Sequence, residues 1–350
     1  MQTTRDLRIA GSHSLVTPQT LYQQYPLDEA DGAFINQSRT ELEQILSGKD
    51  PRLLCIVGPC SVHDPVALLE FAERFKAGTE GLKDALLPVL RVYFEKPRSV
   101  MGWKGLINDP DLDGSFKISK GLGMARELLV QVAAMRLPAA TEFLDTTFGQ
   151  YFADLISFGA IGARTVESQV HRELASGLSM PVGFKNTTYG HIDVAIDAIR
   201  SAAHPHWFPS LTPDGAPAIL ESTGNPYACL ILRGGKDTGP NYSAEHVNAA
   251  AAALQQHKLS PGMVIDMSHG NSEKQHSRQA AVGQDIAAQI RSGQSAISGI
   301  MMESHLVAGN QSIDAKPRVY GQSITDACLA WDDTLPVLNE LADAIRDSRL

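Results

Sequence analysis

Apolar residues along the chain fall into short runs, separated by segments in which apolar positions recur every three or four residues. A short run bounded by turn residues predicts a buried strand, and the longer period predicts a helix with one buried face. Residues 53–57 form the first run, and Asp64-Pro65 then begins a helix, because Asp caps a helix N-terminus and Pro suits its first position. Leu68, Phe71 and Phe75 share one face of that helix. The unit is therefore a strand, a loop and a helix.

This unit recurs along the rest of the chain. Further strands are predicted at residues 89–94, 139–143, 160–163, 181–184, 228–232, 263–266 and 299–302. Helical patterns lie between most of them, at residues 121–135, 168–175, 192–202, 244–256 and 279–290. Eight strands that alternate with helices predict an α/β fold, a parallel (β/α)8 TIM barrel. A length of 350 residues is usual for one such barrel.

Two segments depart from this alternation. Residues 1–50 contain short helical stretches and turn signals, which predict an extension that packs on the barrel or on a neighbouring subunit. Residues 210–226 contain Pro213-Asp214-Gly215 followed by an apolar run, which predicts an inserted β-hairpin before the sixth strand. The chain is thus divided into an N-terminal extension, 1–50, and a barrel, 51–350, with a hairpin at about 210–226.

Composition and charge exclude several classes of function. The net charge of −9 argues against a nucleic-acid partner, because binding that polymer needs a cationic surface. No apolar run approaches the roughly 20 residues that span a bilayer, and the first residues lack the apolar core of a signal peptide. We therefore expect a cytoplasmic protein without a membrane partner. Four scattered cysteines are too few for a disulfide framework, so a cysteine with a special role is expected to be a ligand or nucleophile.

The active site of a (β/α)8 barrel forms at the C-terminal ends of its strands. Almost every predicted strand is followed there by a charged or metal-binding residue. In chain order these are Cys60, Glu95, Glu142, Arg164, Lys185, Arg233, Asp266, His269, Glu303 and His305.

The positive residues near these strand ends form a cationic set in an acidic protein. Arginine offers a planar fork that matches carboxylate and phosphate, and lysine supplies a movable point charge. The set predicts substrates with more than one anionic group. Its members are Arg91, Lys96, Arg98, Arg164, Lys185, Arg233 and Lys236.

A second set consists of Cys60, His269, Glu303 and Asp326. One thiolate, one imidazole and two carboxylates suit a divalent transition metal better than calcium, and such an ion acts as a Lewis acid on a carbonyl group. Each residue also has an ordinary interpretation, as a small buried thiol, a structural histidine or a solvated charge. Their joint placement at strand ends favours the metal site.

Several motifs make the chain closely similar to one known family over almost its whole length. They are GPCS (58–61), YFEKPR (93–98), GWKGLINDP (102–110), GAIGART (159–165), residues 167–178, GFKN (183–186), LRGGK (232–236) and ITD (324–326). The chain resembles the type I 3-deoxy-D-arabino-heptulosonate 7-phosphate (DAHP) synthases, the first enzymes of the shikimate pathway. The resemblance implies a transferase that condenses phosphoenolpyruvate with erythrose 4-phosphate and releases phosphate.

The resemblance also implies roles for individual residues. Cys60, His269, Glu303 and Asp326 match the ligands of a divalent metal ion, for which Mn²⁺ is favoured over Co²⁺, Fe²⁺ or Zn²⁺. Lys96, Cys60 and His269 are the expected catalytic residues, with Lys96 as a proton donor to the nascent alkoxide. Substrates are expected to meet Arg91, Lys96, Arg98, Ser99, Glu142, Ala163, Arg164, Lys185 and Arg233. Within this set, Arg164 and Arg233 match the residues that hold the phosphoenolpyruvate phosphate, and residues 96–99 match the segment that receives erythrose 4-phosphate.

The same resemblance implies that the extension and the hairpin build a regulatory pocket for an aromatic amino acid. Gly149 and Ser210 favour tryptophan, then phenylalanine, over tyrosine as the effector. A homodimer or homotetramer is also implied, with the extension reaching across an interface. The pocket positions are Gly149, Gln150, Ser179, Phe208, Ser210 and Leu220.

Two departures from the family pattern leave alternatives open. Ser99 stands where the family usually has Thr, and Thr187-Thr188-Tyr189-Gly190 stands where it has Gly-Thr-Asp-Gly. The second change lies just beyond Lys185 and is expected to bear on aldose specificity or regulation. The alternatives are a sister enzyme that condenses phosphoenolpyruvate with another aldose, and a catalytically silent regulatory paralogue.

Overall fold

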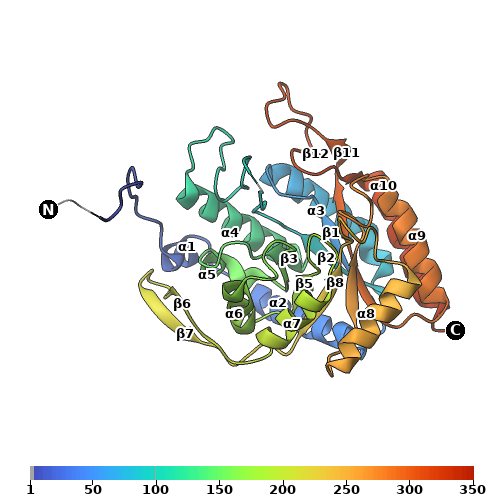
Figure 1. Ribbon diagram of the computed structural model, residues 1–350. Coiled ribbons are helices and arrows are strands. Elements are labelled where there is room, and N and C mark those ends of the chain that lie inside the picture. Colours follow the sequence, from blue (N-terminus) through green and yellow to red (C-terminus); the bar gives the residue numbers. More distant parts are fainter. Residues whose placement is uncertain (1–3, 99) are drawn as a thin grey trace.

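Eight parallel strands close into a barrel in the structure, a computed structural model that describes residues 4–98 and 100–350 (Figure 1). The strands pair in chain order, and the last pairs with the first through Leu54 and Gly299. The predicted (β/α)8 barrel is therefore confirmed. Its strands are β1 (Leu53–Gly58), β2 (Leu86–Arg91), β3 (Ala139–Glu142), β4 (Phe158–Ile161), β5 (Val182–Lys185), β8 (Ala228–Leu232), β9 (Met263–Asp266) and β10 (Ile297–His305).

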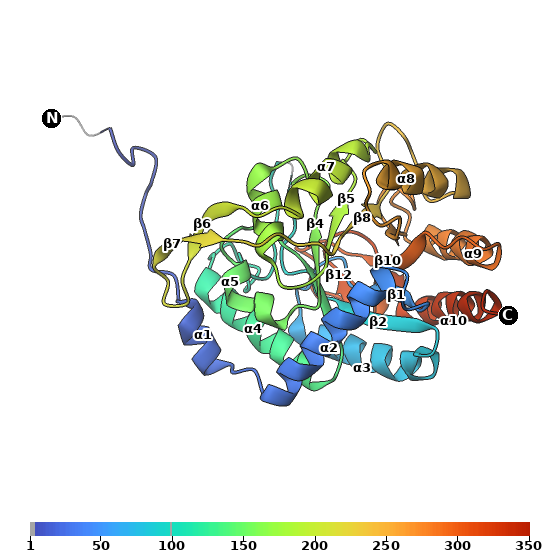
Figure 2. The same ribbon diagram turned by 90° about the horizontal axis from the view of Figure 1, so that it is seen from below.

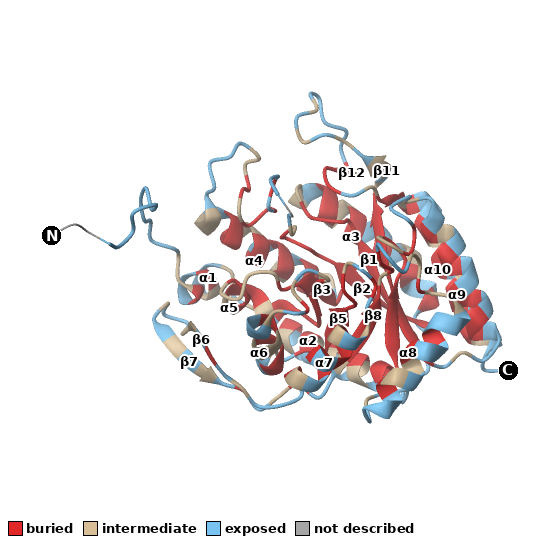
Figure 3. Ribbon diagram, in the orientation of Figure 1, coloured by how far each residue is buried: buried red, intermediate tan, exposed pale blue. Residues whose placement is uncertain are grey.

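Helices surround this barrel and turn their buried faces toward it (Figure 3). The carboxylate of Asp64 accepts hydrogen bonds from the backbone N–H groups of Val66 and Ala67, which confirms the predicted start of the first of them. The helices are α3 (Pro65–Thr79), α4 (Ile118–Ala134), α5 (Gly149–Phe152), α6 (Gln169–Gly177), α7 (Asp193–Ala202), α8 (Ala244–Gln256), α9 (Arg278–Arg291) and α10 (Trp331–Asp347), with 3-10 turns at Glu80–Leu82 and Ala153–Leu155.

The N-terminal extension contains α1 (Pro18–Gln24) and α2 (Glu29–Leu46). Helix α2 lies across the N-terminal end of the barrel (Figure 2), where Leu42 and Ile45 join the buried cluster of interior residues such as Ile56. The Arg39 guanidinium donates to the carbonyl oxygen of Ile156 at 2.8 Å and ties this helix to the barrel wall. Helix α2 thus closes the barrel. Residues 4–15 extend away from it (Figure 1), whereas Val16 is tied to the barrel wall by hydrogen bonds with Ser119 and Tyr151.

The inserted hairpin consists of β6 (Trp207–Leu211) and β7 (Pro217–Glu221), which pair antiparallel before the sixth barrel strand. It begins at Trp207 and not at residue 210, because Trp207 already pairs with Glu221. Three short strands, β11 (Val307–Asn310), β12 (Gln322–Ser323) and β13 (Leu329–Ala330), lie in the loop between β10 and α10. None of the helices in the described part of the chain is both long and apolar enough to cross a membrane.

Candidate functional site

A pocket of about 390 Å³ opens at the C-terminal end of the barrel strands. Of the residues expected at the substrate and metal sites, Ser99 lies outside the described residues, and Glu303 is buried beneath the pocket. Lys236 is exposed and does not line the pocket. The expected residues that line it are Cys60, Arg91, Lys96, Arg98, Glu142, Ala163, Arg164, Lys185, Arg233, His269 and Asp326.

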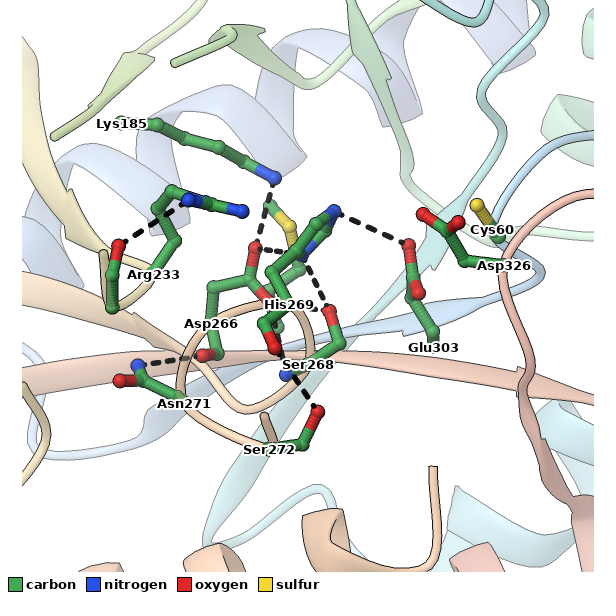
Figure 4. A network of polar contacts seen from close by, with 12 residues as sticks. Cys60, Lys185, Arg233, Asp266, Ser268, His269, Asn271, Ser272, Glu303 and Asp326 are labelled. Atoms are coloured by element: carbon green, nitrogen blue, oxygen red, sulfur yellow. Dashed lines mark hydrogen bonds and ion pairs between the residues drawn. The ribbon is translucent and has the colours of Figure 1, made fainter. Parts of the chain in front are cut away.

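Three of the four predicted metal ligands form a compact cluster. Cys60, Glu303 and Asp326 offer ligand atoms that all lie within 4.8 Å of one another. They come from the loop after β1, the C-terminal part of β10 and the loop before β13, so segments far apart in sequence supply them (Figure 4). A thiol and two carboxylates at this spacing fit one divalent cation.

His269 borders this cluster through its outer ring nitrogen, Nε2, which lies 3.7 Å from Glu303 Oε1 (Figure 4). Its other nitrogen, Nδ1, lies 2.9 Å from Asp266 Oδ2. A carboxylate on Nδ1 fixes the ring and leaves Nε2 available as a ligand. Burial lowers the pKa of His269, which favours the neutral imidazole that a metal needs. His269 therefore suits the role of fourth ligand.

Arg91 joins the backbone of one predicted ligand to the side chain of another. Its guanidinium is buried and donates to the carbonyl oxygen of Cys60 and to Glu303 Oε1, both at 3.1 Å. It also stacks on the ring of Tyr93, with 3.5 Å from Cζ to the ring centroid. Arg91 thus holds the cluster together as well as lining the pocket.

Lys96 places a positive charge at the boundary between cluster and pocket. Its ammonium donates to Asp326 Oδ2 at 2.7 Å and lies 2.9 Å from Cys60 Sγ. Burial raises the pKa of the Cys60 thiol to about 11, and the Glu303 carboxylate acts in the same direction. Burial also opposes ionisation of Asp326, but Lys96 holds the pKa of that carboxyl well below its usual range. The Lys96 ammonium therefore offsets negative charge of the cluster.

The far side of the pocket carries guanidinium groups and a buried ion pair. Burial lowers the pKa of Arg233, and the nearby Arg164 guanidinium acts in the same direction. The ammonium of Lys185 donates to Asp266 Oδ2 at 2.8 Å, so Asp266 contacts both Lys185 and His269 (Figure 4). Two neighbouring guanidiniums form a site for a polyanion such as phosphate.

Carboxyl groups from β3 and from the loop after β2 complete the wall. Glu142 is buried, and Oε1 has no hydrogen-bond partner among the described residues. Only glycine fits at residue 162 without a shift, because a Cβ there would lie 2.1 Å from this oxygen. Burial, with help from Asp145, raises the pKa of Glu95 to about 8. Glu142 thus offers an unused acceptor, which fits its expected role in substrate binding.

Several buried amides at the site were not expected from the sequence. Asn186, Asn241 and Asn271 lie beneath the pocket, and Gln279 pairs with the backbone of Glu303 through two hydrogen bonds of 2.9 Å. The sequence feature that points to them is that Asn186 and Asn271 follow predicted strands. A neutral amide in that position does not by itself distinguish a site residue from a turn residue.

Comparison with known proteins identifies the family. A sequence model described as the DAHP synthetase I family matches residues 25–339. The chain is 52% identical over 350 residues to the Trp-sensitive phospho-2-dehydro-3-deoxyheptonate aldolase of Salmonella typhimurium, with 100% of both chains covered. This chain belongs to the DAHP synthetase I family. The resemblance drawn from the sequence motifs is therefore confirmed.

Two further relatives place the chain within this family. It is 53% identical over 345 residues to the Phe-sensitive phospho-2-dehydro-3-deoxyheptonate aldolase of Escherichia coli K12, with 98% of each chain covered. The solved structure of the phospho-2-dehydro-3-deoxyheptonate aldolase of Francisella tularensis SCHU S4 matches with a TM-score of 0.96 at 49% identity. That match covers 98% of this chain and 100% of the other. The family fold thus extends over nearly the whole chain.

The residues expected at the regulatory pocket lie in the inserted hairpin and in the segments next to it. Gln150 Nε2 donates to Ser210 Oγ at 3.3 Å, next to Gly149 in α5. Phe208 and Leu220 face each other across the hairpin, whereas Ser179 is exposed before β5. The extension also reaches the hairpin, because the backbone N–H of Gln19 donates to Pro213 O at 2.7 Å. The structure thus brings the extension and the hairpin into contact, and the role of these residues stays a prediction.

Of the four residues Thr187-Thr188-Tyr189-Gly190 after β5, only Thr188 lines the pocket. The family pattern has Thr at that position too, whereas Thr187 and Tyr189 depart from it. Thr187 is buried, and Tyr189 is half exposed. The two residues that differ from the family therefore do not contact the pocket directly.

Proposed function

We propose that this protein condenses phosphoenolpyruvate with erythrose 4-phosphate to form DAHP and inorganic phosphate. The observation that carries the proposal is one pocket in which a guanidinium pair faces a compact thiol and carboxylate cluster. Such a pocket suits one phosphorylated substrate beside a carbonyl that must be activated. Relatives that match the chain from end to end are named phospho-2-dehydro-3-deoxyheptonate aldolases.

The cationic residues divide between the two substrates in this proposal. Arg164 and Arg233 hold the phosphate of phosphoenolpyruvate, and Arg91 and Lys185 lie near its carboxylate and bridging oxygen. Residues 96–99, with Arg98 and Ser99, receive erythrose 4-phosphate. Glu142 and Ala163 line the space between them. Two substrates held at fixed positions react as if at very high local concentration.

The metal in this proposal is held by Cys60, His269, Glu303 and Asp326, with Mn²⁺ favoured and Co²⁺, Fe²⁺ or Zn²⁺ as alternatives. The fit rests on the 4.8 Å cluster and on the Nε2 of His269, which faces Glu303. When bound, such an ion supplies Lewis acidity toward the aldehyde of erythrose 4-phosphate.

The reaction then needs one new carbon–carbon bond and the loss of phosphate. C3 of phosphoenolpyruvate attacks the aldehyde carbon, and water adds at C2 before the C2–O bond to phosphate breaks. Lys96 donates a proton to the alkoxide that forms. Although burial opposes it, the neighbouring thiol and carboxylates raise the pKa of Lys96, so the ammonium form that can donate prevails at neutral pH.

Regulation by an aromatic amino acid is part of the proposal, with tryptophan as the first candidate effector and phenylalanine as the second. The relatives include proteins named Trp-sensitive and Phe-sensitive. The contacts of Gln150 with Ser210 and of Gln19 with Pro213 support a pocket where hairpin and extension meet. A homodimer or homotetramer in the cytoplasm completes the proposal.

The test follows the loss of phosphoenolpyruvate absorbance with erythrose 4-phosphate and Mn²⁺, before and after chelation. Chelator-sensitive turnover that needs erythrose 4-phosphate is the expected result. Arabinose 5-phosphate as the aldose tests for a sister enzyme, and its preferred use would contradict the proposal. Folded, metal-loaded protein without turnover would favour the silent paralogue.

A further inference from the structure

Three asparagines lie beneath the cationic side of the pocket and form one hydrogen-bonded chain. Asn186, Asn241 and Asn271 have exposed fractions of 0%, 4% and 3%. Asn241 donates from Nδ2 to Asn186 Oδ1 at 3.2 Å, and its backbone N–H donates to Asn271 Oδ1 at 2.8 Å. The chain runs from the end of β5, through the loop after β8, to the loop after β9. It thus links the strand ends that carry Lys185, Arg233 and Asp266.

Asn186 and Asn241 hydrogen-bond to the backbone of Arg233 and Gly234. Asn186 Oδ1 accepts the N–H of Arg233 at 2.8 Å, and Asn241 Oδ1 accepts the N–H of Gly234 at 2.7 Å. Asn186 Nδ2 donates to the carbonyl oxygen of Gly234 at 3.0 Å. The carbonyl oxygen of Arg233 accepts the N–H of Gly270, also at 3.0 Å. Every backbone polar group of this dipeptide therefore has a partner, and asparagine side chains supply three of the four.

Asn186 has no spare hydrogen-bonding capacity. Besides its contacts with Gly234, Arg233 and Asn241, its Nδ2 donates to the carbonyl oxygen of Thr187 at 2.9 Å. Two donors and two acceptor positions are thus all used, which is the full capacity of an amide. A carboxylate cannot make this pattern, because two of the four partners are carbonyl oxygens.

Asn271 extends the same support to the metal side. Its Nδ2 donates to the carbonyl oxygens of Leu232 at 3.1 Å and of Asp266 at 2.8 Å (Figure 4). Asp266 in turn contacts Lys185 and His269. Gly234 adopts a φ of +69°, and a Cβ there would lie 2.5 Å from Gly270. The turn after β8 is therefore fixed both by its asparagine contacts and by close packing.

We infer that Asn186, Asn241 and Asn271 are positioning residues, which hold Arg233 at a fixed place relative to Lys185 and thereby set the affinity for phosphoenolpyruvate. The inference rests on the proposed function. The guanidiniums of Arg164 and Arg233 repel each other before an anion is bound, so a flexible turn would let Arg233 move away. A rigid turn removes that freedom in advance and lowers the entropy that binding must overcome.

The experiment compares Asn186→Ala and Asn241→Ala with a matched control, Asn225→Ala. Asn225 is also buried, and its Nδ2 donates to the carbonyl oxygens of Ala175, Leu178 and Met180. It precedes β8, at the opposite end of the barrel. All three changes remove buried hydrogen bonds, so all three are expected to lower the melting temperature.

Isothermal titration calorimetry measures the affinity for phosphoenolpyruvate at a temperature where circular dichroism shows each variant folded. It thus separates an effect on the placement of Arg233 from an effect on the stability of the fold. The first two variants should raise the dissociation constant of phosphoenolpyruvate by about tenfold to a hundredfold. Asn225→Ala should leave it within about twofold, since it is remote from the pocket. Asn241→Ala leaves Asn186 in place, so it carries the test if Asn186→Ala does not fold.

Two results would overturn the inference. One is unchanged phosphoenolpyruvate affinity in the folded Asn186→Ala or Asn241→Ala protein, and the other is an equal loss of affinity in Asn225→Ala. Failure of the wild-type protein to bind phosphoenolpyruvate would instead overturn the proposed function, so the two failures are distinguishable.

Discussion

The ammonium nitrogen of Lys96 lies 2.9 Å from the sulfur of Cys60. The same ammonium donates to Asp326, so one side chain contacts two predicted metal ligands and also lines the substrate pocket. The backbone N–H of Cys60 also donates to Cys328 Sγ at 3.4 Å, across 268 positions of chain, and Lys96 reaches Asp326 across 230. Only the closed barrel brings these residues together. Cys60 lies at the centre of these contacts.

Replacing Cys60 with alanine should lower Mn²⁺ affinity and metal-dependent turnover by at least about a hundredfold, because it removes one of the four predicted ligands and leaves the site incomplete. The fold should persist, since a small side chain is removed from the pocket floor. Equilibrium dialysis with Mn²⁺ and a thermal melt measure the two properties. Cys229→Ala is the matched control, because Cys229 is also buried but lies in the barrel interior. Full metal-dependent turnover by the Cys60→Ala protein would contradict the assignment.

Glu95 predicts a dependence of stability on pH. Burial raises its pKa in the folded protein from 4.5 to about 8. A carboxyl with a raised folded pKa favours folding below its unfolded pKa, and this contribution is lost as the pH rises toward 8. Glu95→Gln removes this penalty and should therefore stabilise the protein at pH 9 by up to about 5 kcal/mol, with little change at pH 4.5.

Urea unfolding at the two pH values measures this difference. Glu73→Gln, at an exposed position on α3, is the matched control for the loss of one carboxylate. A Glu95→Gln protein that is equally stabilised, or destabilised, at both pH values would show that Glu95 does not titrate between them.

Helix α2 predicts that the extension contributes to the stability of the barrel. Leu42 is fully buried and packs in the cluster that contains Leu54 and Ile56. Leu42→Ala should lower the free energy of unfolding by about 3 kcal/mol, because it removes buried methyl groups and leaves a cavity. Leu15→Ala, in the exposed segment before α1, should change it by less than about 0.5 kcal/mol. Urea unfolding measures both changes. If Leu42→Ala lowered the free energy of unfolding as little as Leu15→Ala, α2 would not be part of the barrel core.

Most of the barrel could be predicted because its strands are apolar runs bounded by turn residues. The site followed from topology, since residues such as Arg164 and Lys185 lie at or shortly after the C-terminal ends of strands, and these ends meet at one end of the barrel. Helix α10 was not predicted, and it contains Pro336, a residue that usually interrupts a helix. It persists because Leu338 and Leu341 are fully buried against the barrel.

The supporting contacts of the site could not be predicted in the same way. Asn186 and Asn241 are ordinary turn residues in sequence, and their role depends on hydrogen bonds across 48 and 55 positions of chain. The raised pKa of Glu95 depends on burial beside Asp145, which comes from the loop after another strand. Such properties arise from contacts between strands, and local residue patterns do not record them.

The two faces of the inserted hairpin allow a test of the regulatory pocket within one strand. Phe208 is 7% exposed and pairs with Leu220, and its ring lies beside Gly177, where a Cβ would be 3.2 Å away. The preceding residue, Trp207, points to the opposite face and is 66% exposed.

Phe208→Ala should raise the tryptophan concentration for half-inhibition by about tenfold or more, because a buried aromatic contact of roughly 1.4 kcal/mol or more is lost. Trp207→Ala is the control, and inhibition curves with tryptophan, phenylalanine and tyrosine are the measurement. Equal effects of both changes would contradict a pocket on the inner face. Inhibition by phenylalanine alone, lost only in Phe208→Ala, would instead keep the pocket and replace tryptophan as the effector.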